Sequence, residues 1–238
     1  MFHNDYIVFD FETLSKDKNK CQLAQLAAVV VDSKKLEIKP GGIFSSYIKP
    51  LSLDAKECEK LDIDAVQQEA LDVNGIKLED LANAPSEEEV WNSFTEFTYK
   101  FNVSKKPWSG LIRAGYNIVN FDNPIIDRLC KKYGPYDSSW GTQKLFHPVA
   151  NFDLLNDMHR WTESIRINNS NSISLDSIRD WMGIDKDGAH NALNDVFVCA
   201  FMMIKMLKLY RNFSKKVVFE NSFVEENKSI AKLMEQYK

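Results

Sequence analysis

The octapeptide YIVFDFET, residues 6–13, combines the hydrophobic run of a buried strand with two carboxylates at its far end. Because side chains alternate along a strand, Asp10 and Glu12 share one face and lie about 6.7 Å apart along it. Two ionised groups this close repel each other and are costly to desolvate, so they require basic partners or cations. Two carboxylates spaced in this way, taken alone, more often mark the solvated end of a strand, so further carboxylates are needed to indicate a site.

Two further strands follow closely along the chain. The segments QLAQLAAVVV (22–31) and GGIFSSYIKP (41–50) are rich in residues typical of strands, and the polar residues 32–35 after the first of them indicate a turn. Closely spaced strands joined by turns predict an antiparallel meander. The segment GLIRAGYN (110–117) predicts a buried fourth strand that leads directly into a helix.

Helical periodicity, with apolar residues three and four positions apart, marks much of the remaining chain. Ser86 and the glutamates after it are typical of a helix start. A later helix is predicted to have Asn123 as its cap and Gly134 as its C-terminal stop, and residues 135–151 are predicted to form a loop. The predicted helical segments are 55–76, 85–101, 123–134, 152–161, 174–183 and 191–212.

The composition excludes several classes of protein. With 238 residues, 44% of them hydrophobic, the chain can bury one large core. A net charge of −4 argues against coating nucleic acid by bulk charge, and the four cysteines form no CxxC pair. The apolar runs are shorter than the ~18 residues of a membrane span, and the N-terminus has no signal pattern. We therefore expect a cytoplasmic protein that is neither secreted nor bound to a membrane.

Three further groups can join the two carboxylates of the first strand. Asp122 follows the fourth predicted strand, and Asp195 lies about one turn into the last long helix, beside core residues. His190 precedes Asp195 by five residues, so both can face one site only if His190 lies in the loop before that helix. Acidic groups at the ends of several core elements suit hard cations such as Mg²⁺ or Mn²⁺.

Three motifs, in this order and spacing, resemble those of a known family. FDFET (9–13), GYNIVNFDNPII (115–126) and GAHNALNDV (188–196) are similar to the motifs of the DEDDh 3′-to-5′ exonucleases, the proofreading-exonuclease type of the ribonuclease H-like fold. The resemblance covers about residues 5–210 and includes SLDSIRDWMGI (174–184). Each motif alone is weak, but the ordered set is specific.

The resemblance implies an α/β fold with a mixed five-stranded sheet in the order 3-2-1-4-5, flanked by helices. Strand 2 is expected to be antiparallel to its neighbours. We assign residues 1–213 to an exonuclease domain and residues 214–238 to a C-terminal extension packed on the same domain.

The resemblance also implies the site and its chemistry. Terminal phosphodiesters would be hydrolysed to nucleoside 5′-monophosphates by a two-metal mechanism. His190 would be the general base, with a pKa of roughly 6.5 when unperturbed. The expected ligands of two divalent ions, Mg²⁺ or Mn²⁺, are Asp10, Glu12, Asp122 and Asp195, which complete the catalytic set.

Substrate contacts follow from the same resemblance. Thr13 and Leu14 are expected to meet the terminal nucleotide, with Leu14 against the base, and Asn117 is expected to lie near the scissile phosphate. The family usually has glycine where this chain has Ser15. A side chain at that position can narrow or reshape the nucleotide pocket.

The polymer is less strongly indicated than the chemistry. Residues 47–50 and 61–84 look more like DNA-directed members than compact oligoribonucleases, so we expect single-stranded or frayed 3′ ends of DNA as substrate. An exoribonuclease that trims RNA 3′ ends is an alternative with the same chemistry. A non-catalytic nucleic-acid-binding domain is a third possibility. A zinc hydrolase built on His147, His159 and cysteines has no supporting ligand spacing.

Overall fold

A five-stranded mixed sheet forms the centre of the computed structural model, which describes residues 4–165, 172–184 and 191–216. β2 is antiparallel to both β1 and β3, whereas β4 is parallel to β1, and β7 is parallel to β4. The strand order confirms the predicted 3-2-1-4-5 arrangement, with β7 as the fifth strand. In sheet order, the strands are β3 (Ile38–Tyr47), β2 (Leu23–Val31), β1 (Tyr6–Thr13), β4 (Ile112–Gly115) and β7 (Asn151–Asp153).

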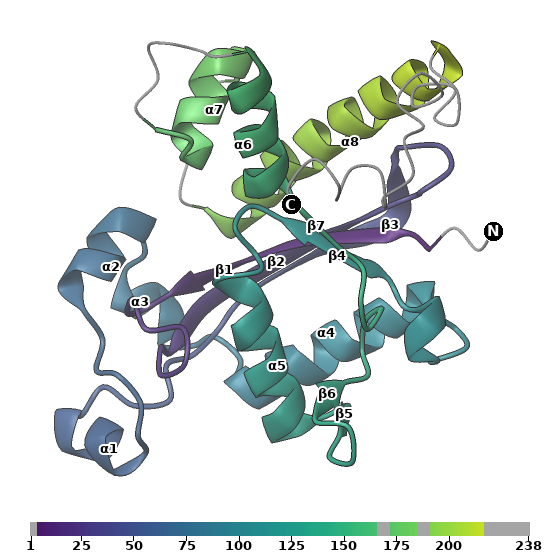
Figure 1. The fold of residues 1–238 in the computed structure, drawn as a ribbon. Coiled ribbons are helices and arrows are strands. Elements are labelled where there is room, and N and C mark those ends of the chain that lie inside the picture. Colours follow the sequence, from purple (N-terminus) through teal and green to yellow (C-terminus); the bar gives the residue numbers. More distant parts are fainter. Residues whose placement is uncertain (1–3, 166–171, 185–190, 217–238) are drawn as a thin grey trace, which may run out of the picture.

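Helices cover both faces of this sheet (Figure 1). One face carries α4 (Glu87–Phe101) and α5 (Asp122–Tyr133). The other carries α6 (Leu154–Ile165), α7 (Leu175–Met182) and α8 (Ala192–Lys216).

Two separate cores result from the alternation of side chains along β1. Phe9 and Phe11 pack with residues of α4 and α5, whereas Val8 packs with residues of α8. Asp10 and Glu12 have the same parity as Val8, so they lie on the face that α8 covers. This is the division of faces that the sequence predicts.

Three short helices lie beyond the end of β1: α1 (Ala55–Lys60), α2 (Gln68–Asn74) and α3 (Leu78–Leu81). The single helical segment predicted over 55–76 is therefore wrong, because residues 61–67 interrupt it. Asp62 takes a left-handed conformation with φ 53°, which a continuous helix cannot contain. A small core that includes Leu14, Leu71 and Leu81 packs α2 and α3 against the end of β1.

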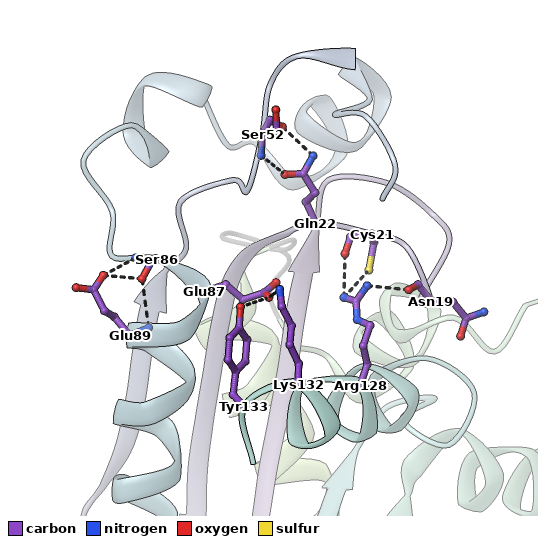
Figure 2. Close-up of polar contacts among 10 residues, drawn as sticks. All are labelled: Asn19, Cys21, Gln22, Ser52, Ser86, Glu87, Glu89, Arg128, Lys132 and Tyr133. Atoms are coloured by element: carbon purple, nitrogen blue, oxygen red, sulfur yellow. Dashed lines mark hydrogen bonds and ion pairs between the residues drawn. The ribbon is translucent and has the colours of Figure 1, made fainter. Parts of the chain in front are cut away.

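A side-chain amide fixes the start of this segment. Gln22, at the entry to β2, donates to the carbonyl of Ser52 at 2.9 Å and accepts from the Ser52 N–H at 3.0 Å (Figure 2). The same amide donates to the Asp64 carbonyl at 3.0 Å. Gln22 is fully buried, so these bonds replace the water that its amide would otherwise bind.

Polar contacts also begin α4 and join it to α5. Ser86 and Glu89 form a capping box, which confirms the predicted helix start (Figure 2). The buried carboxylate of Glu87 accepts from Lys132 at 2.9 Å and from Tyr133 at 3.0 Å, both on α5. These bonds satisfy a charge that would otherwise be costly to bury.

The start of α5 differs from the prediction. The helix begins at Asp122 after Phe121, so the prediction of Asn123 as its cap is wrong. Asp122 accepts a hydrogen bond from the backbone of Phe11 at 3.2 Å, so a contact with β1 sets the first turn rather than a local cap. Gly134 ends the helix as predicted.

The segment between α5 and α6 also differs. The predicted loop 135–151 contains a small hairpin, β5 (Tyr136–Asp137) and β6 (Thr142–Gln143). Residues 152–153, predicted as helical, belong to β7, and helix α6 follows directly. A strand of three residues has no period of its own, so the helical pattern after it dominated the prediction.

Helix α8 is long and apolar, and it ends at Lys216, three residues past the predicted domain boundary at 213. Residues 217–238 lie outside the described part of the chain, so the predicted extension stays a prediction. Over residues 4–165, 172–184 and 191–216, no helix combines the length and hydrophobicity needed to cross a membrane.

Candidate active site

Three carboxylates meet on the α8 face of the sheet. Asp10 and Glu12 come from the end of β1, and Asp195 comes from the first turn of α8. One ligand atom from each lies within 4.8 Å of the other two. These three residues are called the acidic cluster below. The structure thus brings together three of the four metal ligands that the sequence predicts.

The position of Asp195 depends on how α8 begins. Gln25, paired with Glu12 across the β1–β2 ladder, accepts a hydrogen bond from the Ala192 N–H at 3.3 Å. Asn191 accepts from the Leu193 N–H at 3.2 Å and so caps the first turn. The sheet therefore holds the helix end that carries Asp195.

Asp122, the fourth predicted ligand, lies beside the acidic cluster. It is 3% exposed, and its contact with the Phe11 N–H ties the start of α5 to β1 between Asp10 and Glu12. Burial, followed by the charge of Asp10, raises the pKa of Asp122, and the charge of Glu12 adds to this effect. The group of atoms within 4.8 Å does not include Asp122.

The carboxylates are strongly perturbed. Burial, followed by the charge of Asp195, raises the pKa of Asp10 to about 7. Burial and the charges of Asp10 and Asp195 raise the pKa of Glu12 to about 9. Burial also raises the pKa of Asp122 well above its ordinary value. A divalent cation among these oxygens would offset both the repulsion and the loss of solvation, so the donor set fits a hard metal ion.

Among the described residues, the acidic cluster is the only group of three or more acids, histidines or cysteines that could hold an ion. His147 and His159 belong to no such group, so the zinc alternative has no support. His190 lies outside the described residues. Its role as the general base therefore stays a prediction.

Sequence reasoning missed Arg179, which lies in this site. Its side chain is on α7 and 1% exposed, and its Nη2 donates to Oδ1 of Asp195. The charge of Arg179 lowers the pKa of Asp10, against the stronger effects that raise it. A signal was present: Arg179 occupies the i+4 position of the apolar stripe formed by Leu175, Ile178 and Met182, where a charge requires a buried partner.

Asp153 is the second residue that the sequence did not indicate. At the end of β7, its buried carboxylate accepts from the N–H groups of Asn117 at 2.9 Å, Val119 at 3.0 Å and Leu155 at 3.0 Å. Asn117 has a left-handed backbone, φ 59°, which these bonds help to hold. Asp153 thereby shapes the loop that leads to Asp122. The predicted contact of Asn117 with the scissile phosphate stays a prediction.

The other predicted substrate residues lie where β1 meets α2. Thr13 lines a cavity of about 180 Å³ with Ser15, Phe121 and residues of α2. Leu14 is fully buried in the core under α2 and α3. The Ser15 hydroxyl donates to Asp64 at 2.7 Å, so that hydroxyl is already engaged by the chain itself. The contacts of these residues with a nucleotide stay predictions.

Comparisons with known proteins agree with this geometry. The family model RNase_T, described as exonuclease, matches residues 7–202. No curated protein sequence gives a significant match.

Several solved structures share the fold. Escherichia coli Exonuclease I in complex with a dT13 oligonucleotide matches with a TM-score of 0.61 and 22% identity over 94% of this chain and 44% of that chain. The same enzyme with dA16 matches with a TM-score of 0.60 and 22% identity, over 84% of this chain and 40% of that chain. Exonuclease I from Methylocaldum szegediense matches with a TM-score of 0.61 and 21% identity, over 84% of this chain and 40% of that chain. The chain therefore spans about two-fifths of the length of these proteins.

Proposed function

Because the chain belongs to the RNase_T exonuclease family, whose model spans residues 7–202, we propose that it hydrolyses nucleic acid from the 3′ end. The products would be nucleoside 5′-monophosphates. The observation that carries this proposal is the acidic cluster, in which three carboxylates from β1 and α8 converge with Asp122 beside them. Such a concentration of like charge is costly for a metal-free fold and suits a site that works with cations.

The acidic cluster and Asp122 would hold two divalent ions, Mg²⁺ or Mn²⁺. Bound there, such ions supply charge that stabilises the attacking and leaving oxygens of a phosphodiester. The chain itself supplies the positions: Gln25 and Asn191 hold the helix end that carries Asp195, and the Phe11 N–H orients Asp122. His190 would accept the proton of the attacking water, because an imidazole can do so near neutral pH.

We propose DNA with a single-stranded or frayed 3′ end as the substrate. Structures of E. coli Exonuclease I contain dA16 and dT13 oligonucleotides, and a further structure of this enzyme is a zinc-bound complex with single-stranded DNA. In this chain, the cavity beside Thr13, walled by α2, is where a terminal nucleotide would lie. RNA trimming by the same chemistry is the competing outcome of the test below.

The test is a matched digestion of single-stranded DNA and RNA oligomers, labelled at the 3′ or the 5′ end, with Mg²⁺ or EDTA. The wild type is compared with Asp10→Ala and Glu12→Gln. The control is Glu88→Gln, which removes an exposed carboxylate from α4, on the opposite face of the sheet. We expect metal-dependent shortening from the 3′ end in the wild type and the control, and no cleavage in the two site variants.

Each other outcome has a definite meaning. Faster loss of ribonucleotides at equal length would replace DNA with RNA as the substrate. Shortening from the 5′ end would refute the polarity. Binding of both polymers without cleavage would select the non-catalytic alternative.

A further inference from the structure

Arg179 is unusual because a permanent positive charge is buried inside a site of four carboxylates. Its guanidinium donates to Asp195, and its Nη1 lies 3.9 Å from a carboxylate oxygen of Asp176, one helical turn away. The Nε atom is buried with no hydrogen-bond partner among the described residues. An arginine side chain keeps its positive charge at every pH that a folded protein tolerates, so deprotonation does not remove this charge from the site.

This charge alters the balance of the site. The acidic cluster and Asp122 together carry a formal charge of −4 when ionised, and Arg179 adds one positive charge to them. The Asp176 carboxylate near the guanidinium is more exposed than that of Asp195, so water screens its charge more strongly. Arg179 therefore offsets part of the negative charge that would attract a second divalent ion.

The hydrogen bond between Arg179 and Asp195 also disfavours a second ion. Asp195 is a proposed metal ligand, and Arg179 already donates to its Oδ1 oxygen. An ion that approaches this oxygen meets the guanidinium as a like charge at close range, where charges interact strongly because little water lies between them. The first ion can use Asp10 and Glu12, whereas a second ion that shares Asp195 faces this repulsion.

We propose that Arg179 is an internal counter-ion that weakens the second metal site of the free enzyme. This inference rests on the proposed function, since it deepens the account of the same metal site. Arg179 acts through Asp195 and is a positioning residue. Because of this repulsion, the enzyme without substrate should bind one metal ion tightly and the second only weakly.

The test counts bound Mn²⁺ by titration calorimetry and electron paramagnetic resonance at pH 8, with and without thymidine 5′-monophosphate as the phosphate probe. Three variants are compared with the wild type. Arg179→Met removes the charge and keeps the bulk, and Arg179→Lys keeps the charge. Arg113→Met is the matched control, because Arg113 is also buried, with Nε lacking a partner among the described residues, but it faces Asp127 on α5.

We expect the wild type to bind one Mn²⁺ tightly and the second at least about tenfold more weakly until the nucleotide is added. Arg179→Met should tighten the second ion at least about tenfold without nucleotide, while Arg179→Lys and Arg113→Met should resemble the wild type. Damage to the fold would weaken metal binding rather than tighten it, and circular dichroism of each variant checks the fold. Two equally tight ions in the free wild type, or no tightening in Arg179→Met, would overturn the inference. Failure of the wild type to bind any Mn²⁺ would instead overturn the metal site of the proposed function.

Discussion

Replacing Asp10 with asparagine is expected to stabilise the metal-free protein while abolishing its activity. In the unfolded chain Asp10 loses its proton near pH 3.8, whereas in the folded, metal-free site its pKa is about 7. A raised carboxyl pKa means that stability is fully present below pH 3.8 and is lost as the pH rises to 7. The shift corresponds to about 4 kcal/mol at pH 8 and about 1 kcal/mol at pH 4.5.

Asparagine has nearly the same shape and no charge, so Asp10→Asn should recover much of this free energy. We expect a rise in Tm of roughly 10 °C in EDTA at pH 8 and a much smaller rise at pH 4.5. Thermal unfolding followed by circular dichroism measures both values. Asp72→Asn, an exposed acid on α2, is the control and should shift Tm by less than about 2 °C.

Added Mg²⁺ should make the wild type more stable than Asp10→Asn. An ion that binds only the folded state raises its stability by mass action, and the wild type has the ligand that the variant lacks. Equal or lower stability of Asp10→Asn in EDTA at pH 8 would refute the reasoning, since it would show that Asp10 is not destabilising in the metal-free fold.

Three further outcomes are expected. Gln25→Ala, which frees the start of α8, should weaken Mn²⁺ binding and lower kcat about tenfold or more, measured by calorimetry and steady-state kinetics; unchanged values would mean that Gln25 does not position Asp195. Asp153→Asn replaces a charged acceptor of three backbone N–H groups, and urea unfolding should show a loss of about 2 to 3 kcal/mol. Ser86→Ala should cost about 1 kcal/mol by the same measurement and leave kcat unchanged, because it removes only the cap of α4.

Much of the fold could be predicted from the sequence because its strands and long helices have strong periods. The face that carries Asp10 and Glu12 follows from alternation along β1 alone. Short elements could not be predicted from periodicity. β7 has only three residues, and its place in the sheet comes from parallel pairing with β4.

The site could be predicted in part for the same reason. Its acidic residues belong to motifs near the ends of strong elements, so their convergence could be expected. The supporting contacts of Arg179, Gln25 and Asp153 join segments far apart in the chain, and a single sequence does not reveal such partners. The prediction of Asn123 as the cap of α5 was wrong because a remote contact sets the helix start. The backbone N–H of Phe11 donates to Asp122, the first residue of the helix.

The order of the elements along the chain has a consequence for protein synthesis. Asp10 lies in the first strand, whereas Asp195 lies on α8, which the ribosome produces after every other described helix. A growing chain thus holds the carboxylates of β1 and α5 before it contains the helix that completes the acidic cluster. The acidic cluster therefore cannot assemble until Asp195 has been synthesised and α8 has packed against the sheet.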